Sequence, residues 1–274
     1  GDRWRHASSI GPRNSYPGRD QLLDICRILR ADPSSRQAVL QIWDHERDLG
    51  TNTRDHACNL TATFQVQRHL GVRRLNMSVF CRSNDILWGC YGANAVHFSM
   101  LHEYVWLRLR DVCPEIGVYE QISVNWHAYE SVWTPMMEKR RRTPDQCASG
   151  YLDPYEHQTI RAGGEPVAPH YLCDGVLDDT WDDDVRKFVT ADGRLPRWYS
   201  PKNSFFDDVA RPIVAAHDHY KDLIQSLVAD PSANKSIASR DWDTVYAHLR
   251  ECAASDWRLA CEQGMDRRRL KSNG

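Results

Sequence analysis

The stretch from Cys58 to Tyr129 constrains this chain more than any other, because chemically active side chains recur there beside strand-like segments. It begins with a cysteine, continues through an arginine in CRSND (81–85), and ends with a histidine and a tyrosine two residues apart in NWHAY (125–129). A nucleophile, a cation, an amide and a His-x-Tyr pair in that order favour an enzyme that acts on a phosphorylated small molecule.

The apolar pattern of the first half predicts an α+β fold. Alternating or β-branched residues indicate strands, and apolar residues three and four apart indicate helices. A helix is expected over 19–30, a turn over 71–73, and a long core helix from Asn94 to the Cys113-Pro114 pair. Strands are expected at residues 36–43, 59–66, 75–81 and 118–125.

The character of the sequence changes after the first half. Residues 131–200 are rich in Pro, Gly and Asp, which favours loops, and helices are expected at 204–229 and 240–263. We therefore predict a catalytic core over 1–130 and a loop-rich, helical C-terminal extension over 131–274 that packs on the core.

Composition limits the class of partner. The net charge of −2 and pI near 6.7 argue against a general nucleic-acid-binding protein, which would carry a basic excess. No apolar run approaches the ~18 residues that a membrane span needs. The nine cysteines form no CxxC pair, which favours reduced thiols in a cytoplasmic protein over disulfides or a zinc site. His217 and His219 are interpreted as solvated helix residues rather than metal ligands.

Cys58 has two interpretations from the residues alone. A cysteine beside a strand is most often a small, buried, apolar side chain. Arginines at positions 36 and 82 favour the alternative of a reactive thiolate, because a nearby cation lowers the pKa of a thiol.

The other polar residues are open to similar alternatives. Arg82 is compatible with an ordinary surface ion pair to Asp85, and Asn94 with a helix N-cap. His127 and Tyr129 are compatible with core positions, although their spacing along a strand places both side chains on one face.

Several segments, in order and in approximate register, resemble the thymidylate synthase superfamily, which includes pyrimidine-nucleotide hydroxymethylases of phages. The resemblance covers residues 1–129 and fits best over 32–129. It implies a mixed sheet with a long core helix, a homodimer with shared active sites, and action in the cytoplasm, or the host cytoplasm for a phage-encoded enzyme. The segments are RADPSSRQAVLQIWD (30–44), the cysteine at 58, CRSND (81–85), GCYGAN (89–94) and NWHAY (125–129).

The resemblance implies that the substrate is a pyrimidine nucleoside monophosphate. Cys58 would be the nucleophile, adding as thiolate to C6 of the base. Arg82 and Ser83 would hold the 5′-phosphate, with Arg82 also near the thiolate. Arg36 would reach the phosphate in the active site of the partner subunit.

The resemblance also implies 5,10-methylenetetrahydrofolate as cofactor. Asp85 would lie beside the folate and the base, close to the Gly89 backbone. Asn94 would read N3 and the 4-substituent of the base, and His127 and Tyr129 would bind the sugar 3′-hydroxyl. The family uses no metal.

The sequence departs from the family in several places. It begins at GDRWR, in the middle of a family segment, which we interpret as a truncated sequence. Asn59 follows the nucleophile where the family has histidine, and Gln37 follows Arg36 where many members have a second arginine. The glycine turn carries one inserted residue before Asn94.

Three hypotheses follow. The long C-terminal tail and the segment WGCYGANAVHFS (88–99) favour hydroxymethylation, and Asn94 favours dUMP as substrate, with a cytidylate as the alternative. Thymidylate synthesis, which makes dTMP from dUMP, is the second hypothesis. A non-catalytic nucleotide-binding relative is the third, supported by the missing N-terminal segment.

Overall fold

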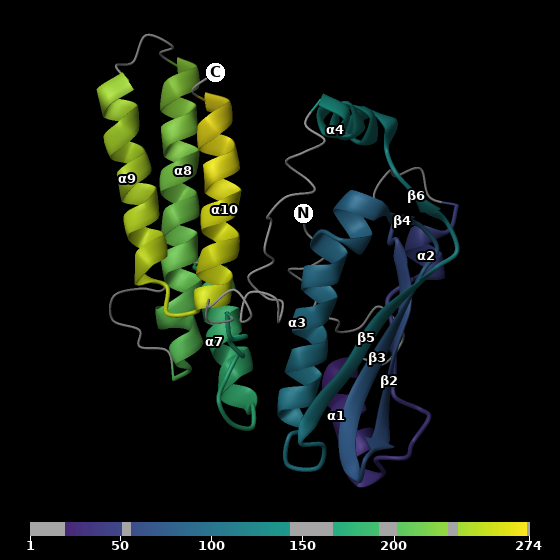
Figure 1. Ribbon diagram of the computed structural model, residues 1–274. Helices are drawn as coiled ribbons and strands as arrows, with labels where there is room; N and C mark the ends of the chain where they lie inside the picture. The colour runs from purple at the N-terminus through teal and green to yellow at the C-terminus, as the bar shows by residue number, and fades with distance from the viewer. Residues whose placement is uncertain (1–19, 51–55, 143–166, 192–201, 230–234, 273–274) are drawn as a thin grey trace. The chain divides into compact units, whose positions relative to one another are not determined.

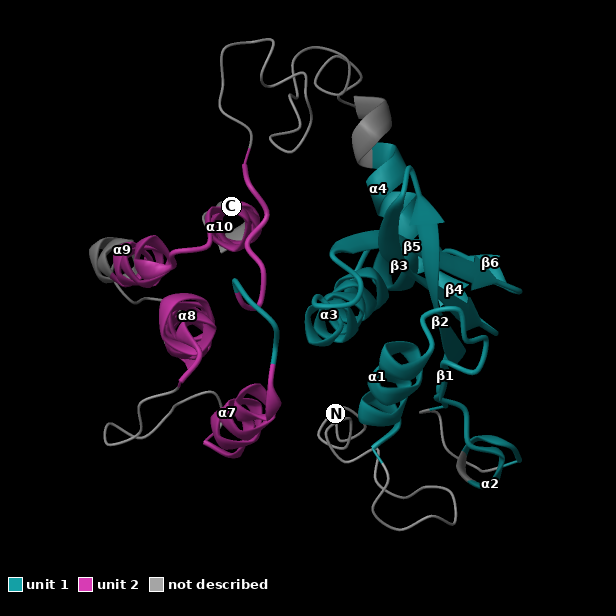
Figure 2. Ribbon diagram, turned by 90° about the horizontal axis from the view of Figure 1, so that it is seen from below, with its two compact units in different colours: residues 1–151, 174–177 teal, residues 152–173, 178–274 magenta. Residues whose placement is uncertain are grey.

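The computed structural model describes residues 20–50, 56–142, 167–191, 202–229 and 235–272 (Figure 1). Contacts divide the chain into two compact units (Figure 2). The first comprises residues 1–151 and 174–177, and the second comprises 152–173 and 178–274. All the candidate site residues belong to the first unit, and the functional boundary after residue 130 stays a prediction. The GDRWR segment lies outside the described residues.

The first unit is built on a four-stranded sheet of order β1-β2-β3-β5. The β1–β2 and β2–β3 pairs are antiparallel and the β3–β5 pair is parallel, which confirms the predicted mixed sheet and α+β fold. The strands are β1 (Val39–Gln41), β2 (Asn59–His69), β3 (Val72–Cys81) and β5 (Glu115–Ser123). A second, parallel sheet pairs β4 (Asn84–Asp85) with β6 (Trp126–His127).

A tight turn joins β2 to β3. Leu70 and Gly71 have positive φ angles of 48° and 85°. Two consecutive residues with positive φ suit the two-residue hairpin turn whose twist matches the flanking strands. The prediction of a turn over 71–73 is therefore wrong in position. The turn lies at Leu70 and Gly71, and Val72 and Arg73 already belong to β3 and pair with β2.

Two helices, α1 (Gln21–Ala31) and α3 (Ala93–Arg108), lie side by side on one face of the sheet (Figure 2). Asp20 caps α1 by accepting the first backbone N–H groups. Because side chains alternate along a strand, every second residue of β3 faces these helices. Full burial stabilises such a side chain by about 1.5–3 kcal/mol relative to exposure. The buried set on β3 is Leu75, Met77, Val79 and Cys81.

The helices differ from the predictions in three places. The core helix α3 ends at Arg108 rather than at Cys113-Pro114, because the Leu109 N–H donates to the Trp106 carbonyl, only three residues back, at 2.9 Å. Short helix α2 (His45–Asp48) lies between the strands expected at 36–43 and 59–66, where no helix was predicted. Helix α4 (Glu130–Arg142) begins the segment in which loops were expected.

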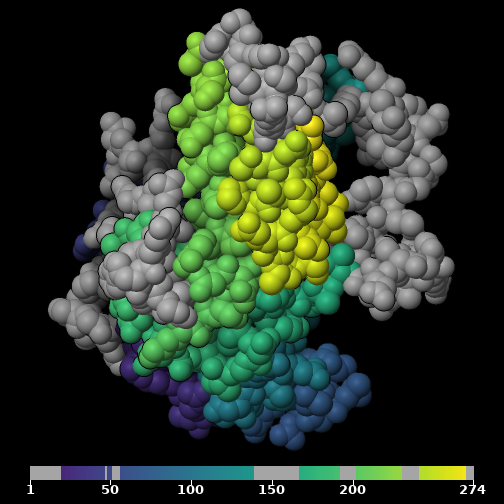
Figure 3. All heavy atoms as spheres, turned by 90° about the vertical axis from the view of Figure 1, so that its left-hand side faces the viewer, coloured from purple at the N-terminus to yellow at the C-terminus, as the bar shows by residue number. Residues whose placement is uncertain are grey.

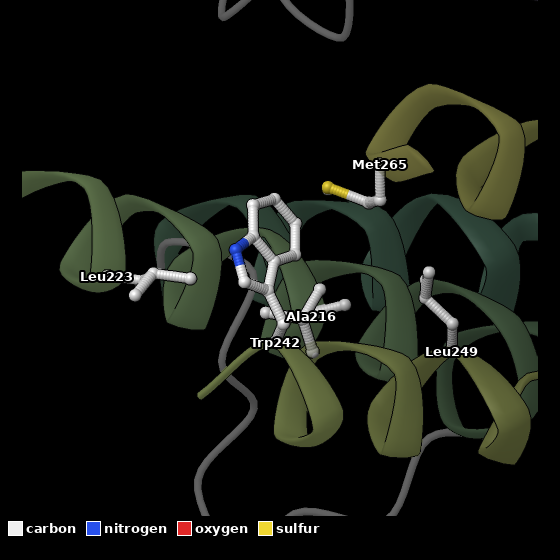
Figure 4. Packing of buried hydrophobic residues seen from close by; sticks show 6 residues of the cluster. Ala216, Leu223, Trp242, Leu249 and Met265 are labelled. Carbon is white, nitrogen blue, oxygen red and sulfur yellow. The ribbon is translucent and has the colours of Figure 1, made fainter. Parts of the chain in front are cut away.

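The second unit is helical, and its helices α8, α9 and α10 share an apolar cluster (Figure 4). Trp242 of α9 lies at the centre of this cluster, between Leu223 of α8 and Met265 of α10. The side chains of these helices form a continuous packed surface in the space-filling view (Figure 3). The elements are α7 (Asp179–Thr190), the π-helical turn η2 (Phe206–Ala210), α8 (Arg211–Ala229), α9 (Lys235–Glu251) and α10 (Ser255–Ser272).

The helix expected over 240–263 is interrupted after α9. Pro212 of α8 contributes to this break. Proline has no N–H to donate to the carbonyl four residues earlier, so that carbonyl is left for another donor. That carbonyl, on Asp208, accepts the Ala253 N–H at 2.8 Å, at the point where the chain turns from α9 into α10. Among the described helices, none is both long and apolar enough to cross a lipid bilayer.

Candidate active site

The topology of the sheet brings distant residues to one edge. β3 and β5 are parallel, so their C-terminal ends lie at the same edge, and antiparallel β2 begins there. Cys58 precedes β2, Arg82 follows β3, and His127 follows β5. We call this edge, with Asp85 and Asn94, the active edge.

Cys58 is an exposed free thiol at the active edge. Its backbone carbonyl accepts the Arg82 N–H at 3.0 Å, which extends the β2–β3 ladder by one bond. The preceding residue is held by a buried carboxylate, since Asp48 Oδ1 accepts the Ala57 N–H at 3.2 Å. Exposure on a fixed backbone suits a nucleophile that must reach a substrate.

Arg82 clamps the segment that carries the thiol. Its Nε donates to the Ala57 carbonyl at 2.9 Å, and Nη2 donates to the His56 carbonyl at 3.5 Å. The guanidinium lies 5.5 Å from the centre of the Trp43 ring. Among the described residues Arg82 forms no ion pair with Asp85, so the surface-pair interpretation is wrong, and its outer N–H groups remain for an anion.

Asp85 ties two parts of the active edge together. One carboxylate oxygen accepts the N–H groups of Leu87 and Trp88 at 2.9 and 2.6 Å, and the other accepts the Tyr129 N–H at 3.2 Å. These backbone donors, that of Trp88 first, lower the pKa of Asp85, and nearby His127 acts in the same direction.

The glycine turn contains a π-helical turn, η1 (Ile86–Cys90). Tyr91 N–H donates to the Ile86 carbonyl at 3.0 Å, a bond that spans one residue more than an α-helical turn. A π-helical turn holds one residue more per turn than an α-helix, which is compatible with the insertion expected before Asn94, and the insertion itself stays a prediction. Gly92 is required here, because a Cβ atom on it would lie 2.4 Å from the Leu87 carbonyl oxygen.

Asn94 lies in the first turn of α3 but does not cap it. Gly92 is the N-cap residue, so the N-cap interpretation of Asn94 is wrong. Its Nδ2 instead donates to Oδ1 of Asn84, at 3.3 Å. The side chain is thus held in place by β4 rather than used by its own helix.

His127 and Tyr129 are neighbours in space. Their rings meet edge to face with centres 5.4 Å apart. His127 Nδ1 lies 2.9 Å from Asn125 Oδ1, an acceptor, so Nδ1 carries the hydrogen and Nε2 is left for a ligand. Tyr129 is 56% exposed.

Arg36 is not part of this cluster. It is exposed and precedes β1, in which Val39 lies opposite Thr63 of β2. Thr63 is five residues along β2 from Cys58, about 17 Å at 3.3 Å per residue, and Arg36 lies further still. Arg36 and Cys58 of one chain therefore do not meet.

Several residues at the active edge were not singled out by sequence reasoning. Trp43 contacts Arg82, Asn125 orients His127, and Asp48 holds the Cys58 segment. Asn84 and Asn125 stand inside the segments CRSND and NWHAY, so their position in those motifs was the available signal. Trp43 stands inside the segment RADPSSRQAVLQIWD (30–44) and had the same signal, whereas Asp48 comes from a segment that only the fold brings near.

Comparison with known proteins identifies the family. The thymidylate synthase family model matches residues 1–161 of this chain, which is more than half of its 274 residues. A deoxyuridylate hydroxymethyltransferase of Pseudomonas phage M6 is 35% identical over 259 residues, covering 91% of this chain and 63% of the relative. A deoxyuridylate hydroxymethyltransferase of Bacillus phage SP01 is 38% identical over 117 residues, covering 42% of this chain and 28% of the relative.

The chain therefore spans less than two thirds of the length of either relative. The matched region nevertheless contains the whole active edge, from Cys58 to Tyr129. This protein belongs to the thymidylate synthase family.

Proposed function

We propose that this protein hydroxymethylates dUMP at C5, with Cys58 as the nucleophile. The observation that carries the proposal is the active edge, where Arg82 is hydrogen-bonded to the backbone segment that carries the exposed thiol of Cys58. Both phage relatives bear the name of this activity, which supports it over thymidylate synthesis. We place its action in the cytoplasm of the host cell.

Each part of the nucleotide has a group suited to it. Arg82, with Ser83 beside it, holds the 5′-phosphate, since the planar guanidinium matches a phosphate and two backbone carbonyls already fix its direction. His127 and Tyr129 bind the sugar hydroxyl through Nε2 and the phenol. Asn94 binds the base through its carboxamide.

The surroundings of Asp85 fit a folate cofactor. Three aromatic side chains near it are unusually exposed, namely Trp88 of η1 at 64%, Tyr91 at the end of η1 at 76% and Trp126 of β6 at 58%. Flat exposed rings suit stacking on a flat heteroaromatic ligand. When bound, 5,10-methylenetetrahydrofolate supplies a one-carbon unit at the oxidation level of formaldehyde. Asp85 and the Gly89 backbone hold it in our proposal.

The thiolate of Cys58 activates the base. Its addition to C6 moves the electrons of the C5–C6 double bond toward the 4-carbonyl and makes C5 nucleophilic. Asn94 stabilises this enolate by donating from Nδ2 to O4 while its Oδ1 accepts from N3–H. Overall, C5 loses its hydrogen as a proton and gains CH₂OH, whose oxygen comes from water. Breaking the bond between Cys58 and C6 restores the double bond.

The active protein in this proposal is a homodimer. On the sheet face opposite α1 and α3, Val118 is 63% exposed, and Val39 and Ile122 are each 44% exposed. A second copy covering this face would explain both the exposed side chains and the distance of Arg36 from its own Cys58. Mixing inactive Cys58→Ala and Arg36→Ala proteins should restore about a quarter of the activity, because each mixed dimer contains one intact site. Absence of any recovery would contradict the shared site.

The nucleophile is tested by the release of tritium from dUMP labelled at C5. Cys58→Ala should abolish release in the presence of methylenetetrahydrofolate. Cys173→Ala, which changes a half-buried thiol in the second unit, should retain it. Release that survives Cys58→Ala would refute the assignment, and failure of the unaltered protein to release tritium would refute the activity.

A further inference from the structure

We infer that Asn84 is a positioning residue, which fixes the orientation of the Asn94 carboxamide and thereby makes the site choose between uracil and cytosine nucleotides. The inference rests on the proposed function, because it deepens the role of Asn94 in binding the base.

A carboxamide can read either base. Uracil presents an acceptor at O4 and a donor at N3, whereas cytosine presents a donor at the 4-amino group and an acceptor at N3. A carboxamide has one donor end and one acceptor end, so turning Asn94 by half a turn exchanges one pattern for the other. Discrimination therefore requires something that prevents the turn.

A chain of hydrogen bonds supplies that restraint. Asn94 Nδ2 donates to Asn84 Oδ1 at 3.3 Å. Asn84 Nδ2 donates to Gln121 Oε1 at 2.8 Å and to Ser123 Oγ at 3.1 Å. Gln121 Nε2 donates to the Cys90 backbone carbonyl at 3.5 Å. All three amides thus donate in the same direction.

The last acceptor in this series of hydrogen bonds, the Cys90 carbonyl, fixes the direction in which each amide donates. A backbone carbonyl can only accept, so Gln121 must turn its nitrogen to Cys90 and its oxygen to Asn84. Asn84 must then turn its nitrogen to Gln121 and its oxygen to Asn94. A flipped Asn94 would set two carbonyl oxygens against each other.

Burial makes this restraint effective. Asn84 is 1% exposed, so water cannot replace a lost partner. Its backbone is also fixed, since its N–H donates to the Asn125 carbonyl at 2.8 Å. A flipped Asn84 would place its oxygen against Gln121 Oε1 and would lose its bond to Asn94, so the arrangement with its oxygen on Asn94 is favoured.

Gly89 gives independent support. A Cβ atom on this residue would lie 2.1 Å from Asn84 Oδ1 and 3.1 Å from Asn94 Nδ2. The bond between the two amides thus runs through space that only glycine leaves open. The turn before α3 is built around this contact.

The test compares dUMP with dCMP. Dissociation constants for both nucleotides are measured by calorimetry on the full chain, and tritium release from C5 gives kcat/KM for each. The unaltered protein should prefer dUMP. Asn84→Leu should lower the dUMP-to-dCMP ratio by about 10-fold or more, partly through improved binding of dCMP. Asn84→Asp should keep the ratio, because a carboxyl oxygen can still accept from Asn94 Nδ2.

Asn76→Leu is the matched control. Asn76 also bonds within the sheet, to Gln67 and to the Val118 N–H, but it has no link to Asn94. It should lower the melting temperature without changing the ratio. Gln121→Leu, at a half-buried position, replaces Asn84→Leu if the latter does not fold.

Two results contradict the inference in distinguishable ways. An unchanged ratio in folded Asn84→Leu, or in Gln121→Leu, would overturn the positioning role alone. Binding of neither nucleotide by the unaltered protein would overturn the proposed function and the inference with it.

Discussion

At the scale of single residues, Arg82 and Asp85 each combine a structural bond with a proposed role in binding. Arg82 donates two hydrogen bonds to the backbone carbonyls of the Cys58 segment, and its other N–H groups remain for a ligand. Both carboxylate oxygens of Asp85 accept hydrogen bonds from backbone N–H groups, one oxygen from the η1 turn and the other from Tyr129.

Asp85 should make stability depend on pH. Its pKa is lowered in the folded protein, chiefly by the Trp88 N–H. Its contribution is therefore fully present above the unfolded pKa of about 3.9 and is lost as pH falls through the lower folded value. Asp85→Asn should reduce the free energy of unfolding at pH 7 more than at pH 3, which urea denaturation at the two pH values measures.

The conservative control for this prediction is Asp111→Asn. Asp111 is a surface carboxylate that pairs with Arg30 at 2.7 Å, and such pairs contribute about 0–1 kcal/mol. An Asp85→Asn penalty that is the same at pH 3 and pH 7 would contradict the role of the carboxylate charge.

At the scale of elements, the turn η1 leads into α3 and so helps to place Asn94. Its closing bond joins Tyr91 to Ile86, and Gly92 passes against the carbonyls of that turn. A side chain at position 92 would clash with the backbone of Leu87 and Trp88, and that backbone cannot move aside without disrupting η1.

Gly92→Ala should be strongly destabilising. The added Cβ would lie 2.4 Å from the Leu87 carbonyl oxygen and 2.7 Å from that of Trp88, so the expected loss is about 1–3 kcal/mol or more. The denaturant midpoint measures it. Gly175→Ala is the control, since nothing lies within 4 Å of its Cβ position, and it should change stability by about 0.5 kcal/mol or less. Equal midpoints for the two variants would contradict this view of the turn.

The sequence was most informative where a motif is contiguous. The strands, the core helix and the order of Cys58, Arg82, Asn94 and His127 follow from periodicity and from short segments that resemble a family. The contacts among Asn84, Gln121 and Cys90 could not be predicted, because they join three segments through a sheet register that the sequence does not display.

Local irregularities were missed for a different reason. Apolar periodicity assumes regular helices, so it did not predict the π-helical turns or the break between α9 and α10. That break depends on a tertiary bond from Ala253 to the carbonyl that Pro212 leaves without a donor. Helix α4 was missed because it contains Pro135 and follows no clear apolar stripe.

At the scale of the whole molecule, the chain consists of a sheet-based unit that holds the active edge and a helical unit with its own core. The family model ends at residue 161, so the matched region covers residues 1–151 of the first unit and only the beginning of the second. The relative from Pseudomonas phage M6 matches over 91% of the chain, which includes helices of the second unit. The match to that relative therefore extends well beyond the residues that the family model covers.

The central claim is that Cys58 activates dUMP for transfer of a hydroxymethyl group. Incubation of the protein with dUMP and methylenetetrahydrofolate, followed by mass analysis of the nucleotide, tests it most directly. We expect a product heavier than dUMP by CH₂O, with tetrahydrofolate as the folate product, and no product from Cys58→Ala. A product heavier by CH₂ and accompanied by dihydrofolate would contradict the account.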